Sequence, residues 1–281
     1  MAAFKRIDAH HHFWKYKPEL FPWITEELSM VARDFLPEEF EEVIKTSGID
    51  STVAIHNFRS LEETDTFLAY AEKFSWISAV VGRFPLVSHD VSNIISEYAK
   101  NPWIVGARDI LQFPEVSPYF EEPAFHRGLS AVANHGLTYD LLIGPWQMEQ
   151  CIQLVDAHPD LQFILSHLGK PPIASGDIRA WESAFIKISK RPNVVCKLSG
   201  LPLEANFPDW KEHDIAPCIQ LALDNFGPDR LLFGSDWPPC LMATSYYAWF
   251  NLVERSLSSL SIDEQAQIWS GTATRVYGLS S

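Results

Sequence analysis

Short apolar runs rich in β-branched residues alternate along the chain with longer segments whose apolar residues recur every three or four positions. Most of the short runs, such as VVCKLS and LQFILS, are almost continuously apolar, which is typical of strands that are covered on both faces. They predict eight strands, over residues 6–13, 51–56, 77–84, 104–111, 137–143, 162–168, 193–198 and 230–235.

The longer segments predict amphipathic helices between these strands, over residues 36–48, 60–74, 90–100, 121–136, 147–159, 177–192 and 214–227. Residues typical of helix ends support several of them. Ser60 precedes one helical pattern and Glu63 follows three positions later, which is the pattern of a capping box. Gly48, Gly136 and Gly227 stand where three of the helices are expected to end.

Strand followed by helix, repeated eight times with right-handed crossovers, favours an α/β fold of the (β/α)₈ barrel type. A doubly wound open sheet is the alternative. The 281 residues exceed the usual size of one small domain, but barrels of this kind commonly have about 250 residues. No linker or low-complexity segment divides the chain, so we expect a single barrel domain over residues 1–281.

Charge and composition exclude several classes of function. The formal net charge is −14 and no Lys/Arg cluster offsets it, so a nucleic-acid partner is not expected. No segment approaches the roughly 18 apolar residues of a membrane span, and the first residues lack the apolar run of a signal peptide, so we expect no membrane partner and a cytoplasmic protein. The four cysteines form no CxxC pair, which disfavours a zinc knuckle or a disulfide framework.

In a barrel of this type the active site forms at the carboxyl ends of the strands. The first strand ends in DAHHHF, where alternation places His10 and His12 on one face and His11 on the other. A His-x-His pair on one face suits a metal ion or a pair of hydrogen-bond donors. The alternative is an ordinary run of surface histidines, which is disfavoured because the run follows an apolar strand.

Two further strand ends carry polar residues that can meet this pair. His167 follows the sixth strand in SHLGKP, and Asp236 follows the eighth in FGSDWPP. Taken alone, His167 could be structural and Asp236 could cap a helix. Together with His10 and His12 they lie at the ends of strands one, six and eight, which makes four independent structural roles improbable.

The segments DAHHHFW, SHLGKP, CKLSG and FGPDRLLFGSDWP, in this order, resemble the amidohydrolase superfamily. The resemblance is to its amidohydrolase-2 branch, which contains sugar-lactone hydrolases such as L-fuconolactonase and L-rhamnonolactonase, and it extends over essentially the whole chain. It implies a (β/α)₈ lactonase that opens a cyclic ester with water. His10, His12, His167 and Asp236 match the active-site positions of the branch.

The chain also departs from relatives in this superfamily. Members with two metals have a histidine on the fifth strand, whereas residues 137–143 contain none, so a two-metal site is disfavoured. The resemblance leaves open whether one divalent ion, such as zinc, manganese or magnesium, is bound by His10, His12, His167 and Asp236, or whether the enzyme works without a metal. No organic cofactor is expected. Asp109 stands where relatives often have histidine, which affects the expected substrate preference.

Lactone hydrolysis needs an activated water, a stabilised oxyanion and a proton for the departing oxygen. We expect Asp236 to accept the proton of the water and to return it to the leaving hydroxyl. His10, His12 and His167 would polarise the carbonyl, directly or through a metal. The chain lacks a Gly-x-Ser-x-Gly motif, so a covalent acyl-enzyme is not expected.

Other polar and aromatic residues near strand ends are candidates for binding the sugar, because aromatic faces stack on the C–H faces of sugar rings. Lys197 lies in an apolar strand, so it should either face the barrel mouth or pair with a carboxylate. The candidates for substrate binding are Trp14, Trp23, Arg59, Arg108, Gln112, Trp146, Lys197 and Trp237.

Two other functions remain open from the sequence. One is a metal-dependent non-oxidative decarboxylase, with Arg59 and Arg108 binding the substrate carboxylate; the other is an inactive barrel that only binds a carbohydrate. The expected partner is a small sugar lactone, and the sequence leaves open whether the protein forms a homo-oligomer. The aromatic connection over residues 14–36 could cover the barrel mouth or contact another subunit.

Overall fold

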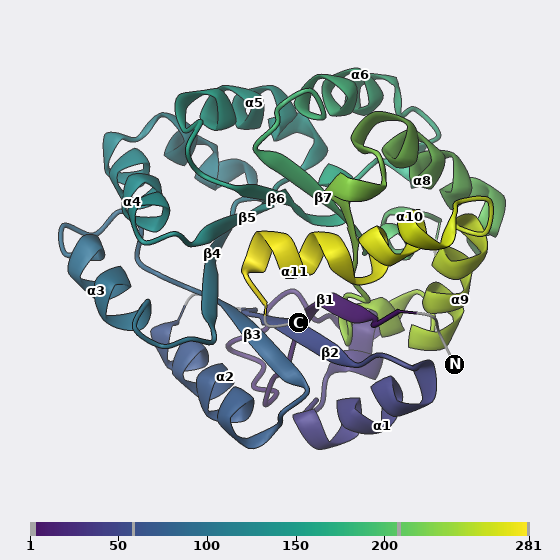
Figure 1. Ribbon diagram of the computed structural model, residues 1–281, viewed down its shortest axis with the longest axis horizontal. Coiled ribbons are helices and arrows are strands. Elements are labelled where there is room, and N and C mark those ends of the chain that lie inside the picture. The colour runs from purple at the N-terminus through teal and green to yellow at the C-terminus, as the bar shows by residue number, and fades with distance from the viewer. Residues whose placement is uncertain (1–3, 58–59, 207–208, 280–281) are drawn as a thin grey trace.

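The computed structural model describes residues 4–57, 60–206 and 209–279. Eight parallel strands follow one another around a barrel in the order of the sequence (Figure 1). Their bounds are β1 Ile7–His11, β2 Ser51–Ile55, β3 Ile77–Gly82, β4 Ile104–Ile110, β5 Thr138–Leu142, β6 Phe163–Leu165, β7 Val194–Leu198 and β8 Leu231–Phe233. The predicted strands therefore all exist, and most of them end earlier than expected.

The contact between the first and last strands closes the barrel. The Asp236 amide donates to the His10 carbonyl at 2.8 Å, and the His12 amide donates to the Trp237 carbonyl at 2.7 Å. The prediction of a (β/α)₈ barrel is confirmed, and the alternative of an open doubly wound sheet is wrong.

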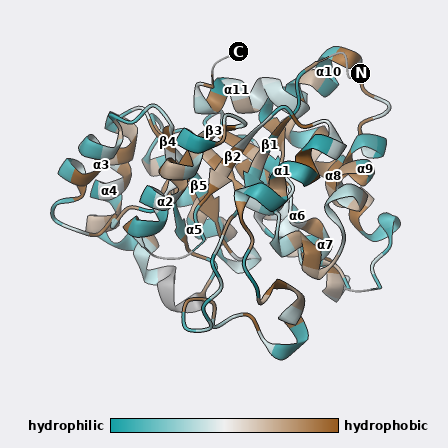
Figure 2. Cartoon of the chain, turned by 90° about the horizontal axis from the view of Figure 1, so that it is seen from below, coloured by the Kyte–Doolittle hydropathy of each residue, from teal (hydrophilic) through white to brown (hydrophobic). Residues whose placement is uncertain are grey.

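Helices surround the strands as predicted, with the hydrophobic residues concentrated toward the centre (Figure 2). Their bounds are α1 Pro37–Ser47, α2 Leu61–Lys73, α3 Val91–Tyr98, α4 Pro123–Asn134, α5 Met148–Ala157, α6 Arg179–Ile188, α7 Leu201–Glu204, α8 Glu212–Phe226, α9 Tyr246–Ser256, α10 Ile262–Ala266 and α11 Thr272–Tyr277. The short α7 and the last three helices were not among the predicted elements.

Predicted helix ends recur in the structure. The Ser60 hydroxyl accepts a hydrogen bond from the Glu62 amide at 3.1 Å, so Ser60 is the N-cap of α2. Gly48 ends α1 with a φ of 68°, in the left-handed region that glycine adopts without steric cost.

The interior of the barrel is closed at the amino-terminal end of the strands. Inward side chains of β1, β2 and β3 form an apolar layer there with the α11 residues Ala273 and Tyr277. Helix α11 crosses the middle of the barrel in Figure 1 and lies at one end of it in Figure 2. Polar side chains occupy the interior above this layer, which leaves the carboxyl end of the strands for chemistry.

The connection over residues 14–36 is held at its base and packs against the barrel. Trp14 and Phe35 exchange two backbone hydrogen bonds of 2.9 Å. The 3₁₀ turn Glu26–Val31 packs against the turn Pro239–Met242, which follows β8. The connection therefore lies beside the carboxyl end of β8, as expected for a segment near the barrel mouth. A subunit contact through this segment stays a prediction.

Two expectations from composition can be compared with the structure. The four cysteines are buried free thiols, in agreement with the expected absence of a disulfide framework. Over the described parts of the chain, every helix is too short or too polar to span a membrane.

Candidate active site

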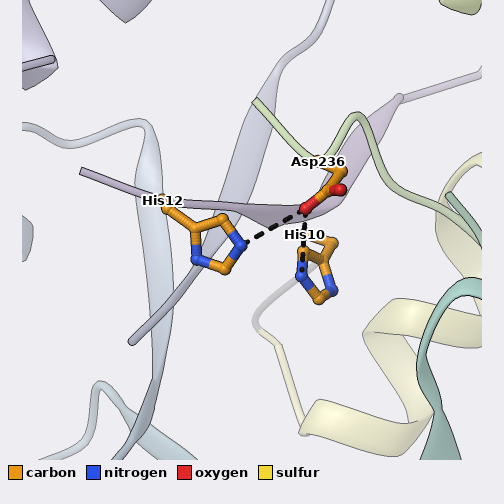
Figure 3. A group of neighbouring side chains, drawn as sticks. All are labelled: His10, His12 and Asp236. Atoms are coloured by element: carbon orange, nitrogen blue, oxygen red, sulfur yellow. Dashed lines mark ion pairs between the residues drawn. The ribbon is translucent and has the colours of Figure 1, made fainter. Parts of the chain in front are cut away.

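A bulge in β1 directs two histidines into the barrel. Asp8 pairs with Thr52 of β2 but His11 pairs with Ala54, so β1 has one more residue than β2 in this interval. His10 and His12 face Asp236, as Figure 3 shows. His11 lies on the outer side, where its Nε2 is 2.8 Å from the Thr52 hydroxyl. The predicted orientation of the three histidines is confirmed.

The other two expected residues lie at corners where the backbone leaves a strand. His167 follows β6 with a φ of 54°, and Asp236 follows β8 with a φ of 58°. Only four non-glycine residues of the described chain have a positive φ, and the other two, Leu168 and Lys170, belong to the corner that contains His167. Such a conformation costs on the order of 1–3 kcal/mol and is concentrated at functional sites.

All four expected residues meet at one carboxylate oxygen. Asp236 Oδ1 lies 3.3 Å from His12 Nε2, 3.6 Å from His10 Nε2 and 3.9 Å from His167 Nε2. The His10 ring centroid is 4.9 Å from that of His12 and 4.5 Å from that of His167. All four side chains are buried, so their electrostatic interactions are weakly screened by water.

Two glycines allow the histidines to approach the backbone closely. A Cβ at Gly200 would lie 2.6 Å from His167 Nδ1, and one at Gly234 would lie 2.6 Å from the Cβ of His10. Gly200 also has a φ of 68°. A larger residue at either position would displace a histidine of the site.

Asp8 is an anchoring residue that the sequence analysis did not identify. Its buried carboxylate accepts hydrogen bonds from the amides of His10 and Ser235, at 3.1 and 2.9 Å, and from the Tyr246 hydroxyl at 3.1 Å. Burial raises the pKa of Asp8 to about 6. Asp8 ties β1 to the corner after β8, and the signal for it was an acidic residue within an apolar strand.

The tautomer of His12 follows from its neighbours. Its Nδ1 lies 2.7 Å from the carbonyl oxygen of Ile55, which can only accept, so Nδ1 carries the hydrogen. Burial lowers the pKa of His12, so the ring is neutral and its Nε2 has a lone pair directed at Asp236. Burial alone would raise the pKa of Asp236, but its interaction with His167 above all lowers the pKa below its usual value. Two acceptors therefore face each other, and they need a proton donor or a cation between them.

His10 lies between two cationic side chains. Lys197 Nζ is 3.2 Å from His10 Nδ1 and 2.5 Å from Asp140 Oδ2. Arg108 Nη1 is 3.4 Å from His10 Nε2, while its other terminal nitrogen donates to the His56 carbonyl. Lys197 thus pairs with a carboxylate, one of the two arrangements expected, and contacts a histidine of the site. Asp140 was missed, although an acidic and a basic residue in two apolar strands pointed to such a pair.

The four tryptophans expected to bind substrate lie in two kinds of environment. Trp14 and Trp237 are buried, and the Trp237 ring stacks on Phe40 at 4.5 Å, so both are packed in the core. Trp23 and Trp146 are 40% and 60% exposed. Trp23 lies on the connection that packs beside β8.

The structure also shows where two of the polar candidates for substrate binding lie. Arg108 lies beside His10, and its Nε has no hydrogen-bond partner among the described residues. The buried Oε1 of Gln112 likewise has no partner among them. Arg59 lies outside the described residues. Asp109, where relatives often have histidine, pairs with Arg83 at 3.1 Å and does not belong to the histidine cluster.

The histidine cluster can supply ligands for one divalent ion. His10, His12 and Asp236 each offer a ligand atom, and these atoms lie within 4.8 Å of one another. Two imidazole nitrogens and one carboxylate oxygen suit zinc, and three protein ligands leave a coordination position open for water. The facing acceptors of His12 and Asp236 fit a cation between them. On β5, the carboxylate of Asp140 pairs with Lys197.

Comparisons with known proteins agree with the fold. The family model Amidohydro_2, described as "Amidohydrolase", matches residues 7–279. An L-fucono-1,5-lactonase of Burkholderia multivorans is 34% identical over 98% of this chain and 96% of its own length. An L-rhamnono-gamma-lactonase of Scheffersomyces stipitis is 24% identical over 56% of this chain and 54% of its own length.

A solved structure is similar over the whole fold. A crystal structure described as an amidohydrolase from Burkholderia multivorans with bound zinc has a TM-score of 0.95 and 34% sequence identity. The alignment covers 98% of this chain and all of the other. Because the family match extends over nearly the entire sequence, the chain belongs to the amidohydrolase family.

Proposed function

We propose that this protein is a sugar-lactone hydrolase that opens an aldono-1,5- or aldono-1,4-lactone to the aldonic acid. L-Fucono-1,5-lactone is the first substrate to test, because a relative of this name is 34% identical over nearly the whole chain. The observation that carries the proposal is the contact of 3.3 Å between His12 Nε2 and Asp236 Oδ1. An ionised carboxylate and an imidazole lone pair together can bind and activate a water molecule.

The nucleophilic water would lie beside Asp236 and His12, within hydrogen-bond distance of both Oδ1 and Nε2. A water that donates one hydrogen to each of these acceptors keeps a lone pair for the carbonyl carbon of the lactone. Asp236 is the general base, because the groups around it keep its pKa low and it is ionised at neutral pH. His12 orients the water, since its Nδ1 hydrogen is held by the Ile55 carbonyl.

The oxyanion and the leaving group would be served by the other side chains of the cluster. Arg108 has donor hydrogens beside His10, so the two side chains can stabilise the negative charge on the former carbonyl oxygen. Burial lowers the pKa of His167 to about 3, so His167 is neutral during the reaction. Asp236 then returns its proton to the ring oxygen as the C–O bond breaks, which gives the hydroxyl and the carboxylic acid of the product. The carboxylic acid then releases its proton to the solvent and becomes the carboxylate.

A divalent metal bound by His10, His12 and Asp236 would act as a Lewis acid and would lower the pKa of a bound water. Asp236 and Arg108 would have the same tasks in that form: Asp236 would accept and return the proton, and Arg108 would stabilise the developing negative charge. Zinc, manganese and magnesium are the ions to test. Activity without a metal is equally compatible with the proposal.

Acid release with a pH indicator tests the proposal. Metal-free and metal-supplemented enzyme would be compared on a panel of aldono-1,5- and aldono-1,4-lactones, beginning with L-fucono-1,5-lactone. Asp236→Asn should lower kcat by about 10²–10⁴-fold, the usual contribution of general-base catalysis. Asp177→Asn is the matched control, because Asp177 is exposed and pairs only with Arg179 in the described structure.

Each outcome has a defined meaning. Fast opening of one stereochemical group of lactones, lost in Asp236→Asn and kept in Asp177→Asn, supports the lactonase and its base. No turnover of any lactone in either metal state contradicts the proposal. Carbon dioxide release from aromatic carboxylates would then indicate the decarboxylase, and binding of a sugar without turnover would indicate a carbohydrate-binding barrel.

A further inference from the structure

Lys197 is buried behind the reaction centre. Its side chain has no exposed surface, and its ammonium lies 2.5 Å from Asp140 Oδ2 and 3.2 Å from His10 Nδ1. Asp140 is held in turn by the Tyr277 hydroxyl, which donates to it at 3.1 Å. The other nitrogen of His10, Nε2, is the one that faces Asp236. Lys197 therefore contacts the edge of His10 that is turned away from the reacting groups.

His10 has a donor-only group beside each ring nitrogen. The ammonium of Lys197 is at Nδ1 and the guanidinium of Arg108 is at Nε2, 3.4 Å away. Both neighbours can only donate, so a ring with hydrogens on both nitrogens would direct one of them at each cation; a ring with one donor and one acceptor nitrogen avoids this. His10 can therefore accept a hydrogen bond from one of the two cations and not from both.

The geometry decides between the two tautomers. The Lys197 contact is the shorter, and its ammonium is fixed by Asp140. If Nδ1 accepts from Lys197, the hydrogen on Nε2 has the carboxylate of Asp236 as a nearby acceptor, at 3.6 Å. If Nδ1 carried the hydrogen instead, that hydrogen would point at an ammonium and Nε2 would direct a lone pair at a carboxylate. The first tautomer satisfies Lys197 and Asp236 and gives up only the longer contact with Arg108, whereas the second satisfies Arg108 and leaves the fixed ammonium of Lys197 facing a hydrogen.

We propose that the Asp140–Lys197 pair is a positioning device that holds His10 as the Nε2–H tautomer. His10 then donates a hydrogen bond into the site, whereas the Ile55 carbonyl makes His12 an acceptor there. The two histidines of one His-x-His motif have opposite roles. This inference rests on the proposed function only for its catalytic meaning, which is that His10 donates to the carbonyl oxygen of the lactone.

The same pair sets how readily the site binds a metal. An Nε2 that carries a hydrogen has no lone pair for an ion, so ligation through His10 Nε2 requires the hydrogen to move to Nδ1. That tautomer places a hydrogen against the donor-only ammonium of Lys197. The Asp140–Lys197 pair should therefore weaken zinc binding and favour the metal-free arrangement of the site.

The experiment compares the wild type with Asp140→Asn/Lys197→Met in metal-free form. The double variant removes both charges, because Lys197→Met alone would leave the Asp140 carboxylate buried without its cation. Lys190→Met, at an exposed lysine, is the control. Circular dichroism and thermal unfolding show whether each variant is folded. If the double variant does not fold, the wild-type tautomer alone decides the proposal.

Two measurements that need no lactone give the answer. In ¹⁵N spectra of ring-labelled histidine, with His10 assigned from His10→Gln, the wild type should show a protonated Nε2 and a bare Nδ1. In calorimetric titrations the folded double variant should bind zinc about 10- to 100-fold more tightly than the wild type, the usual scale for groups that act on a ligand from behind. Lys190→Met should match the wild type in both.

A bare Nε2 in the wild type would overturn the proposal, and so would a folded double variant that binds zinc no more tightly than the wild type. These results are separate from those of the lactone panel. If Nε2 of His10 is protonated but no lactone is turned over, the tautomer assignment stands and only its catalytic meaning is lost.

Discussion

The position of one hydrogen on each histidine ring decides what the cluster can do. His12 has its hydrogen on Nδ1 because a backbone carbonyl lies there, and it turns a lone pair toward Asp236. His10 has the opposite neighbours, with an ammonium at Nδ1. Burial keeps both rings neutral, since it lowers the pKa of each. Two residues of the same type, His10 and His12, therefore give the site one hydrogen-bond donor and one acceptor.

The pH profile of the reaction follows from this burial. Burial lowers the pKa values of His10, His12 and His167, that of His167 to about 3, and the pKa of Asp236 is also below its usual value. These groups gain protons only as the pH falls below the ordinary histidine value of about 6.5. We expect kcat/KM to stay constant as the pH falls from about 8 to about 6.5.

Initial rates of acid release across this range check the prediction, with the stability of the substrate controlled at each pH. A loss of activity with a midpoint near the ordinary histidine pKa would contradict it, because that result requires an imidazole whose pKa is not lowered by burial.

Gly200 is needed for the position of His167. The change Gly200→Ala places a Cβ 2.6 Å from His167 Nδ1 at a φ of 68°, so it combines steric overlap with backbone strain. Gly176→Ala is a matched control, because Gly176 has a φ of 70° with open space around the position of a Cβ. The strain alone should cost about 1–2 kcal/mol of unfolding free energy in both variants.

Steric overlap with His167 should occur only in Gly200→Ala. We expect this variant to lose at least about tenfold in kcat, since small displacements of catalytic groups reduce rates by up to about 10²-fold. Gly176→Ala should keep the wild-type kcat. Urea unfolding and lactone kinetics measure the two effects separately, and equal kcat values for the two variants would show that His167 tolerates the added methyl group.

At the scale of the elements, the contact between β1 and the corner after β8 both closes the barrel and builds the site. The bulge in β1 turns His10 and His12 inward, and the Asp8 carboxylate holds the amides of His10 and Ser235. The site residues therefore lie where the regular ladder ends, on backbone that is fixed by hydrogen bonds between the first and last strands.

Asp8 should make the stability of the fold depend on pH. Its folded pKa of about 6 is above the ordinary value of 3.8, so the folded state binds the proton more tightly than the unfolded chain. Ionised Asp8 therefore lowers stability above about pH 6, and this penalty disappears as the pH falls toward 4. For Asp8→Asn, the free energy of unfolding relative to the wild type should rise by about 2 kcal/mol from pH 4 to pH 7.

Urea unfolding of both proteins at several pH values measures this difference. Asp177→Asn is the control, because its exposed carboxylate has a pKa lowered by hydrogen bonds from Arg179, and its difference from the wild type should not rise with pH. A difference for Asp8→Asn that is independent of pH would mean that the carboxylate has an ordinary pKa in the folded protein.

The elements were predictable to the extent that their apolar pattern is regular. Continuous apolar runs predicted all eight strands, but the prediction extended β6 and β8 into Ser166 and Ser235, where the chain already turns into the site corners. Helices α10 and α11 were missed because a π-helical turn, Gln267–Gly271, interrupts the helical period between them.

The candidate site was partly predictable for a similar reason. Strand alternation placed His10 and His12 on one face without knowledge of the bulge that accompanies it. The tautomers could not be predicted, since the partners of these rings, Ile55 and Lys197, are distant in sequence and only the closed barrel brings them together.

At the scale of the whole molecule, a column of polar side chains runs through the barrel. Tyr277 of α11 donates to Asp140 of β5, Asp140 pairs with Lys197 of β7, and Lys197 contacts His10 of β1. Helix α11 closes one end of the barrel, as Figure 1 shows, and the histidines lie toward the other. The column connects the closed end of the barrel, where side chains pack, with the end that contains the candidate active site. Substitutions at the closed end should change stability, and substitutions at the other end should change activity.

Tyr277→Phe tests this division. The change removes one hydrogen bond to Asp140, but Asp140 keeps its contact with Lys197, so the neighbours of His10 are unchanged. We expect the free energy of unfolding to fall by about 0.5–1.5 kcal/mol, the usual contribution of a hydrogen bond, and kcat/KM to remain within about threefold of the wild type. Tyr247→Phe, at an exposed tyrosine on α9, should change neither quantity.

Urea unfolding and lactone kinetics on the same preparations measure both effects. If Tyr277→Phe lowered kcat/KM by tenfold or more while stability changed little, the hydroxyl at the closed end would control the charge distribution at His10, and the two ends of the barrel would not be separable. We expect a loss of stability with nearly unchanged kinetics. That result would place the functional part of the column at Lys197 and His10, where the ammonium contacts the histidine.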